Sequence, residues 1–258
     1  MNIIVCAKLT PDAGDIEVKS DGSISVERAE WIIGGFDLQA IEAGVRLVEA
    51  HGGAVTVLSA GPRPIAQSRL KKDILSRGPD ALVMVVDERL AGADTAFTAR
   101  VLELAIRKLG AFDLVLCGEG SADLYFQQVG LQLGEMLGAV TLNAINHITL
   151  EGDTLLVERD LEDEVEVLEV PLPAVLSVTT DIHEARLPSM KEILKAGKKP
   201  VNEWSLADLD LPAGLANQTE VISTRAPEQA HRKQEMIEGA PDEAARKLVE
   251  VLKREGLV

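Results

Sequence analysis

The chain has 258 residues, of which 46% are hydrophobic and 26% charged, a composition that favours a folded protein over a disordered one. It carries 26 Lys and Arg against 42 Asp and Glu, which gives a formal net charge of −16 and argues against nucleic-acid and anionic-membrane partners. No apolar run reaches the roughly 20 residues that span a bilayer. Since the start has no basic leader segment either, we expect a cytoplasmic protein without membrane insertion.

The first 138 residues alternate between two patterns. Short apolar runs are typical of strands buried on both faces, and apolar residues three and four apart are typical of helices. These patterns predict strands at 3–7, 54–58, 81–86 and 113–117, and helices at 37–51, 64–75, 93–109 and 123–137. Such alternation predicts an α/β fold with a doubly wound, mostly parallel sheet.

The same topology predicts where a ligand binds. In a doubly wound sheet with strand order 3-2-1-4-5, the ligand lies at the carboxyl ends of the strands where the order reverses. The first and fourth strands are neighbours at that point. We therefore expect the loops that follow them, 7–14 and 118–123, to border a binding site.

Antiparallel patterns begin after residue 139. Residues 148–150 and 154–158 flank a Glu-Gly-Asp turn, which predicts a hairpin. Residues 164–167 alternate strictly, so one face of that strand is expected to be solvated, and residues 172–178 form a further buried strand. We interpret residues 1–200 as one nucleotide-binding domain with an antiparallel hairpin extension.

The remaining residues, 201–258, have a different character. Residues 202–235 are polar with little periodicity, and a final helix is expected at about 241–255. A tail of this kind rarely folds against its own domain alone. We interpret it as a C-terminal arm that packs on a partner subunit, with a flexible tail as the alternative.

The segment Gly118–Gly130 is the first candidate site. It follows a predicted strand and leads into a predicted helix, whose N-terminus would offer free N–H groups to a phosphate, with Ser121 as a further donor. It has neither the Gly-Lys-Ser/Thr of a Walker loop nor the dinucleotide pattern G-x-G-x-x-G. The segment therefore indicates either phosphate binding or only a tight turn.

The segment Gly34-Gly35-Phe36-Asp37 is the second candidate. Two glycines precede an aromatic residue at a predicted helix start. The segment is either a simple turn and cap with Phe36 in the core, or a loop that bends close to a flat ligand.

Catalytic constellations are missing from the sequence. The four histidines are dispersed, and the acidic cluster 160–166 lacks the spacing of a Ca²⁺ loop, so we expect no metal site. Cys6 and Cys117 have no neighbouring base and are expected to pack as reduced thiols. The sequence thus indicates a nucleotide-binding fold with no catalytic residues of its own.

Several stretches taken together resemble the β subunit of electron transfer flavoprotein, namely Val5–Lys8, Phe36–Ala43, Leu58–Pro62, Gly118–Gly130 and Pro173–Ala196. The resemblance runs from residue 1 to about 205 and is weaker in the tail. Lys72–Asp80 and Ser121–Tyr125 look closest to the Fix branch, which is found in carnitine-reducing and nitrogen-fixing bacteria.

The resemblance implies a heterodimer whose α subunit carries the redox FAD, while the β subunit binds AMP or, in electron-bifurcating members, a second FAD. The complex would relay electrons from acyl-CoA dehydrogenase-type flavoproteins to a quinone reductase or a low-potential acceptor. Phe36 also matches an aromatic residue near the α-subunit flavin. The positions that match the family's nucleotide contacts are Cys6, Phe36, Asp37, Ala60, Gly118, Glu119, Gly120, Ser121, Ala122, Asp123, Gln127, Gln128, Val129 and Gly130.

A second implied site is the loop that docks on the dehydrogenase. Residues 181–200 match this recognition loop, and the expected docking residues are Arg186, Leu187, Met190 and Ile193. Met190 falls where the loop offers its apolar anchor.

The chain departs from the family at one point of the nucleotide loop. Bifurcating members read Asp-Gly-Asp-Thr-Ala-Gln-Val-Gly, where this chain has Leu124, Tyr125 and Phe126 after Asp123. These bulky groups would either crowd a flavin or stack on it. The resemblance therefore leaves open whether AMP or FAD occupies the β site, and whether the complex bifurcates electrons.

Two other classes share the doubly wound sheet. A nucleotide-binding sensor of the universal-stress type is shorter and lacks the hairpin extension. An adenylating enzyme needs a pyrophosphate-gripping pattern such as Ser-Gly-Gly-x-Asp-Ser, which this chain does not contain.

Overall fold

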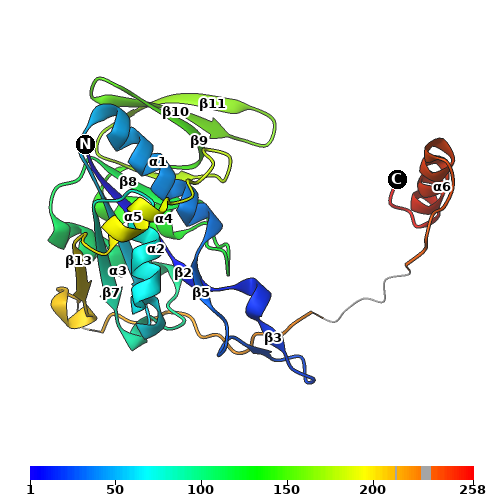
Figure 1. Cartoon of the computed structure of the whole chain (residues 1–258), viewed down its shortest axis with the longest axis horizontal. Coiled ribbons are helices and arrows are strands. Elements are labelled where there is room, and N and C mark those ends of the chain that lie inside the picture. The colour runs from blue at the N-terminus through cyan, green and yellow to red at the C-terminus, as the bar shows by residue number, and fades with distance from the viewer. Residues whose placement is uncertain (213, 228–233) are drawn as a thin grey trace.

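A nine-stranded mixed sheet forms the centre of the molecule (Figure 1). The computed structural model describes residues 1–212, 214–227 and 234–258. The order of the strands is β11-β10-β9-β12-β8-β1-β6-β7-β13. In chain order these strands are β1 (Asn2–Cys6), β6 (Ala54–Gly61), β7 (Ala81–Val86), β8 (Leu114–Gly118), β9 (Val140–Glu151), β10 (Thr154–Asp160), β11 (Val165–Pro171), β12 (Ala174–Val178) and β13 (Val201–Trp204).

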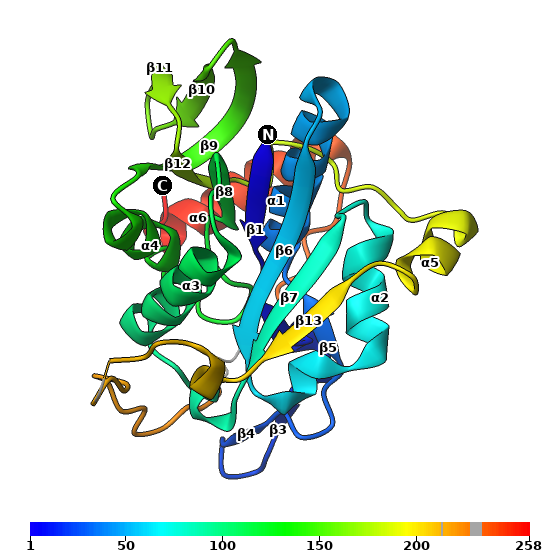
Figure 2. The same ribbon diagram turned by 90° about the vertical axis from the view of Figure 1, so that its left-hand side faces the viewer.

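The parallel part of the sheet confirms the predicted strand order. Strands β7, β6, β1, β8 and β12 lie side by side and pair in parallel, which is the order 3-2-1-4-5. Strand β9 pairs in parallel with β12, and β10 and β11 then add antiparallel strands. The predicted hairpin extension is therefore confirmed, and it lies at one end of the sheet (Figure 2).

Six α-helices occur in the described residues: α1 (Gly35–His51), α2 (Ser68–Ser76), α3 (Thr95–Leu109), α4 (Val129–Leu137), α5 (Met190–Ala196) and α6 (Pro241–Arg254). Alternation along β1 shows how the first four of them, α1 to α4, form two layers. Ile3 and Val5 belong to the core that includes residues of α1 and α2, whereas Ile4 and Cys6 belong to the core that includes residues of α3 and α4. Because both faces of the strands are covered, their residues form continuous apolar runs.

An excursion between β1 and α1 was not predicted from the sequence. It contains two small antiparallel sheets, built from β2 (Leu9–Pro11) with β5 (Trp31–Ile33) and from β3 (Glu17–Val18) with β4 (Ile24–Ser25). These strands have only two or three residues each, too few to show a periodic pattern. The excursion brings the chain back to the carboxyl end of β1, where α1 begins.

The C-terminal segment divides into two parts. Strand β13 pairs in parallel with β7 at the edge of the sheet, and Leu206 behind it is buried, so the start of the expected arm belongs to the domain itself. The carboxylate of Asp94 then accepts hydrogen bonds from the backbone N–H groups of Gln218 (2.5 Å) and Thr219 (3.2 Å). Residues 213 and 228–233 of the expected arm lie outside the described residues. Helix α6 stands apart from the sheet and buries none of its side chains (Figure 1).

None of the helices in the described part of the chain combines the length and apolar content needed to cross a membrane.

Candidate functional site

The loops that follow β1 and β8 meet at the carboxyl edge of the sheet. The ammonium Nζ of Lys8 lies 2.7 Å from both carboxylate oxygens of Asp123. The backbone N–H of Lys8 donates a hydrogen bond to Oδ1 of Asp37, at 3.1 Å. Three segments that are far apart in the sequence are thereby joined at the point where the strand order reverses.

Two glycines allow the start of α1 to pack directly on this edge. A Cβ atom at Gly118 would lie 2.7 Å from Cβ of Phe36, and a Cβ atom at Gly34 would lie 2.4 Å from Oδ2 of Asp37 and 3.6 Å from Cβ of Ala122. Real Cβ atoms do not approach other atoms so closely, so position 118 requires glycine, whereas a larger residue at Gly34 would push the Asp37 carboxylate aside. The two candidate segments of the sequence therefore belong to one site.

Asp37 is the unusual ionisable group of this site. Its side chain is buried, and burial raises the pKa of its carboxyl to about 7, against the opposing effect of the Lys8 N–H and ammonium. Oδ2 is buried and makes no hydrogen bond to the described parts of the chain. A buried polar atom without a partner is costly, and a polar group of a ligand would satisfy it.

The predicted start of the helix after β8 is wrong. The sequence predicted a helix over 123–137, but α4 begins at Val129, six residues later. Tyr125 (φ 50°) and Gln127 (φ 56°) adopt the left-handed conformation, which interrupts a right-handed helix. Residues 121–128 are thus a loop, and the free N–H groups of the helix begin only at its end.

The ring of Tyr125 packs on two parts of this edge. A Cβ atom at Gly120 would lie 2.3 Å from Cδ2 of Tyr125, so the ring packs directly on the glycine backbone. The ring also lies against Phe36, with 5.1 Å between centroids and 37° between planes. At the loop's outer side, Nε2 of Gln127 donates to Oε1 of Glu119 at 2.8 Å. This aromatic pair therefore lies at the same edge as Gly118 and the start of α1.

The first turn of α4 is held against the ends of two strands. A Cβ atom at Gly130 would lie 2.2 Å from Oγ of Ser177 on β12 and 3.5 Å from Cβ of Cys117 on β8. Before this turn, the amide oxygen of Gln128 accepts a hydrogen bond from Oγ1 of Thr95, at 3.0 Å. The helix N-terminus is therefore fixed at the same edge as Lys8 and Asp37.

The two cysteines are neighbours beneath this edge. Cys6 and Cys117 are in register on β1 and β8, and both are buried free thiols. A hydrogen bond between the thiols and their burial raise the pKa of Cys6 well above its usual value. Both thiols therefore pack as buried side chains, as expected from the sequence.

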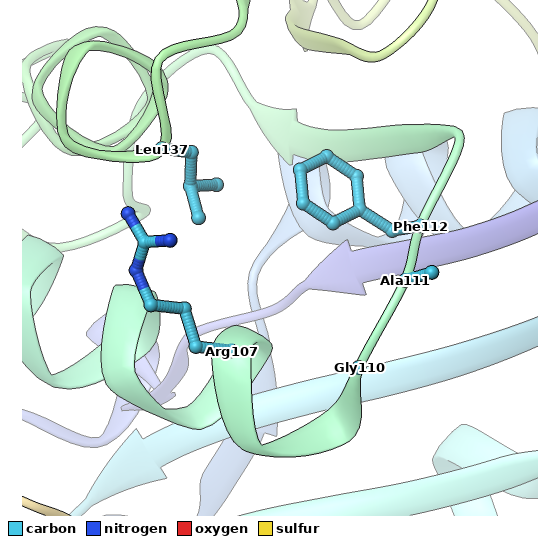
Figure 3. Close-up of a pocket in the computed structure, with 5 residues that line it drawn as sticks. All are labelled: Arg107, Gly110, Ala111, Phe112 and Leu137. Atoms are coloured by element: carbon cyan, nitrogen blue, oxygen red, sulfur yellow. The ribbon is translucent and has the colours of Figure 1, made fainter.

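The described residues contain no group of three or more His, Cys, Asp and Glu side chains that could hold a metal ion. A hollow of about 370 Å³ lies at the opposite edge of the sheet, between the ends of α3 and α4 (Figure 3). Its one charged side chain, Arg107, is already bound to Glu103 and to the carbonyl of Met136. The chemistry of the described chain is therefore concentrated at the carboxyl edge.

The comparison with known families agrees with this geometry. Residues 22–209 match the electron transfer flavoprotein domain, which covers the chain from β4 to just beyond β13. The chain belongs to the electron transfer flavoprotein domain family. Membership implies a subunit of an electron transfer flavoprotein that binds a flavin or nucleotide and has a heterodimeric partner.

A second feature of this electron transfer flavoprotein domain is the exposed segment around α5. Leu187 is 90% exposed and Met190 73% exposed, and Ile193 and Leu194 are exposed as well. Leu194 was not singled out from the sequence, because exposure on so short a helix follows from its packing against α2 rather than from a pattern. The guanidinium of Arg186 turns inward to α1.

The expected nucleotide contacts in this electron transfer flavoprotein domain lie on four neighbouring elements. Phe36 and Asp37 begin α1, Cys6 ends β1, and Ala60 lies near the end of the adjacent β6. The segment 118–130 runs from the last residue of β8 to the first turn of α4. Lys8 was missed as a site residue, although a single cation directly after a buried strand at the switch point could have pointed to it.

Proposed function

We propose that this chain is the β subunit of a heterodimeric electron transfer flavoprotein, closest to the Fix branch. It binds an adenine nucleotide at the carboxyl edge of its sheet and supports the redox FAD of the α subunit. That flavin supplies the electron chemistry when bound, and the chain supplies position and electrostatics.

The observation that carries this proposal is the convergence of Lys8, the first turn of α1 and the loop 118–130 at one edge. Lys8 supplies a cation next to Asp123, and the start of α4 supplies N–H groups for a phosphate. The buried Oδ2 of Asp37 is available to a polar group of the nucleoside, as an acceptor when the carboxyl is ionised and as a donor when it is protonated. An adenine nucleotide contains all of these complementary groups.

Tyr125 affects which nucleotide the site can bind. Its ring covers Gly120 and touches Phe36, where bifurcating members carry a small acidic residue. A flavin tail would meet this ring, whereas a mononucleotide needs less room. We therefore favour AMP in the β site over a second FAD, and simple relay over bifurcation.

The exposed segment around α5 supports a docking function. Leu187, Met190 and Leu194 present apolar side chains to solvent, and Met adapts well to a mobile partner. The partner is a flavoprotein of the acyl-CoA dehydrogenase type, and the acceptor is a quinone reductase or a low-potential protein. The tail with α6 is the arm that holds the α subunit.

A cofactor count on the copurified complex tests the proposal. We expect one FAD and one AMP per heterodimer after denaturing release and chromatography. Two FAD would show that the β site admits a flavin despite the ring of Tyr125 and would favour bifurcation. A colourless protein without adenylate would contradict the proposal and favour the sensor of universal-stress type.

A further inference from the structure

Arg186 connects the docking segment to helix α1. Its Nε donates to Oε2 of Glu42 at 2.7 Å, and Nη1 and Nη2 donate to the carboxylate of Glu49 at 2.7 and 2.9 Å. Its backbone N–H donates to Oε2 of Glu42 as well, at 3.2 Å. All three nitrogens of the guanidinium are thus occupied within the chain, and only 26% of the side chain is exposed.

Glu42 is a firm anchor for this arginine. Its side chain is 3% exposed, and Arg46 donates a second charge-assisted hydrogen bond from the other side, at 2.6 Å. Burial alone would raise the pKa of Glu42, but the hydrogen bonds from Arg186 and Arg46 lower it to about 2. The carboxylate therefore stays charged at every physiological pH, and the contact persists.

A second helix holds the same residue. Nη1 of Arg77, at the end of α2, donates to the carbonyl oxygen of Arg186 at 3.1 Å. Arg186 is therefore fixed through its side chain and through both of its backbone polar groups. A hollow of about 540 Å³, lined in part by Glu42, Glu49 and Leu187, lies beside this contact.

The next residues in the chain are the exposed apolar ones. Leu187 follows Arg186 directly, and α5 begins at Met190 behind a capping box formed by Ser189 and Glu192. Exposed apolar side chains on a loop this short have few buried contacts of their own to fix them. The ion pairs of Arg186 hold the segment at its start, and the packing of α5 against α2 holds it at its end.

We propose that Arg186 is a positioning residue, whose ion pairs with Glu42 and Glu49 fix the start of the docking segment so that Leu187 and Met190 form a preordered apolar surface for the flavoprotein partner. The inference rests on the proposed docking function. It differs from the resemblance, which made Arg186 itself a contact of the partner. Ordering the segment before the encounter lowers the entropic cost of binding.

The test compares three variants of the complex as it is purified from its host. Arg186→Gln removes the guanidinium and its charge, and Arg186→Lys keeps the charge but loses the bidentate hydrogen bonds. Arg107→Gln is the matched control, because Arg107 also pairs with a buried glutamate, Glu103, that keeps a second arginine, Arg100. The control lies on α3, away from the docking segment.

Each variant is examined by two measurements. We expect amide hydrogen exchange of residues 187–196 to quicken about tenfold in Arg186→Gln, less in Arg186→Lys, and not at all in Arg107→Gln. With an acyl-CoA dehydrogenase reduced by its acyl-CoA as the electron donor, we expect KM for this protein to rise about tenfold in Arg186→Gln at unchanged kcat.

The possible outcomes distinguish the positioning role of Arg186 from the docking function of the segment. A higher KM with unchanged exchange would overturn the positioning role and make Arg186 a direct contact. Faster exchange with an unchanged KM would uphold the anchoring of the segment but overturn its docking function. Equal changes in Arg107→Gln would overturn the proposal, since they would reflect general loosening.

Discussion

The ammonium of Lys8 lies 2.7 Å from both carboxylate oxygens of Asp123, so one ion pair closes the gap between loops that are 115 residues apart in the sequence. Both side chains are partly exposed, at 43% and 33%. The pair contributes little to stability, because solvent screens it. At the carboxyl edge the ammonium of Lys8 would be shared between Asp123 and the phosphate of an anionic ligand.

We expect Lys8→Met to weaken AMP binding about tenfold, since a single charge-assisted hydrogen bond to phosphate is worth about 1.5 kcal/mol or more. Unfolding free energy should change by less than about 1 kcal/mol. Titration calorimetry and urea denaturation measure the two effects. Arg28→Met, which removes an equal charge from an exposed pair with Glu17, is the control and should leave AMP binding unchanged.

The contact between Gly120 and Tyr125 gives a second prediction. Gly120→Ala places a methyl group 2.3 Å from the tyrosine ring and should lower the unfolding free energy by about 1–3 kcal/mol through overpacking. In a Tyr125→Ala background the same change should cost less than about 0.5 kcal/mol, because the ring is gone. Equal costs in both backgrounds, measured by chemical denaturation, would show that the ring does not rest on Gly120.

The arrangement of the sheet could be predicted because apolar runs and helical periods are local signals. The predicted hairpin around the Glu-Gly-Asp turn is confirmed for the same reason. Strand β11 shows the limit of such signals. Its alternation is confirmed, but the side that faces solvent carries Val165 and Val167, while Glu166 pairs with Arg159 at 3.2 Å.

The parts that the sequence did not predict depend on contacts between distant residues. Helix α4 begins only after Tyr125 and Gln127, which adopt the left-handed conformation, and Tyr125 packs on Phe36, 89 positions earlier in the chain, a contact that a local helical period cannot reveal. Strand β13 has the sequence Val-Asn-Glu-Trp and becomes a strand by pairing with β7. Likewise, the convergence at the carboxyl edge follows from topology, but the Lys8–Asp123 pair does not.

The raised pKa of Asp37 leads us to expect an unusual pH dependence of the unfolding free energy. Burial raises the pKa of its carboxyl from the ordinary value of 3.8 to about 7 in the fold. Between about pH 4 and 7 the unfolded chain has released this proton while the folded chain still holds it, so rising pH favours unfolding by up to about 1.4 kcal/mol per pH unit. This contribution to stability is complete below about pH 4 and is lost as the pH rises through 7.

The variant Asp37→Asn isolates this contribution. The stability of the wild type relative to Asp37→Asn should fall by about 1–3 kcal/mol between pH 5 and pH 8, as measured by urea denaturation at each pH. Asp153→Asn, in the exposed turn between β9 and β10, removes an equal charge and should run parallel to the wild type. A difference between wild type and Asp37→Asn that is constant over this range would mean that Asp37 titrates normally.

Met190 tests the docking surface. We expect Met190→Asp to raise KM for the dehydrogenase about tenfold or more, because a charge replaces an apolar side chain that is 73% exposed and available to a partner. The melting temperature should not change, since little of this side chain is buried. Val18→Asp in the β3–β4 hairpin is the control, because it also places a charge at an exposed apolar position. Electron-transfer kinetics should show the rise in KM for Met190→Asp and not for Val18→Asp.

The two parts of the C-terminal segment should respond differently to truncation. A chain that ends at residue 227 loses α6, which buries no side chain, and should keep its melting temperature within about 2 °C while losing the copurifying α subunit. A chain that ends at residue 200 also loses β13 and the buried Leu206 and Leu209. Two buried leucines are worth about 3–6 kcal/mol, so its melting temperature should fall by about 6 °C or more. If the chain that ends at residue 227 still bound the α subunit, α6 would not be the arm. The contact with the α subunit would then have to lie within the domain itself.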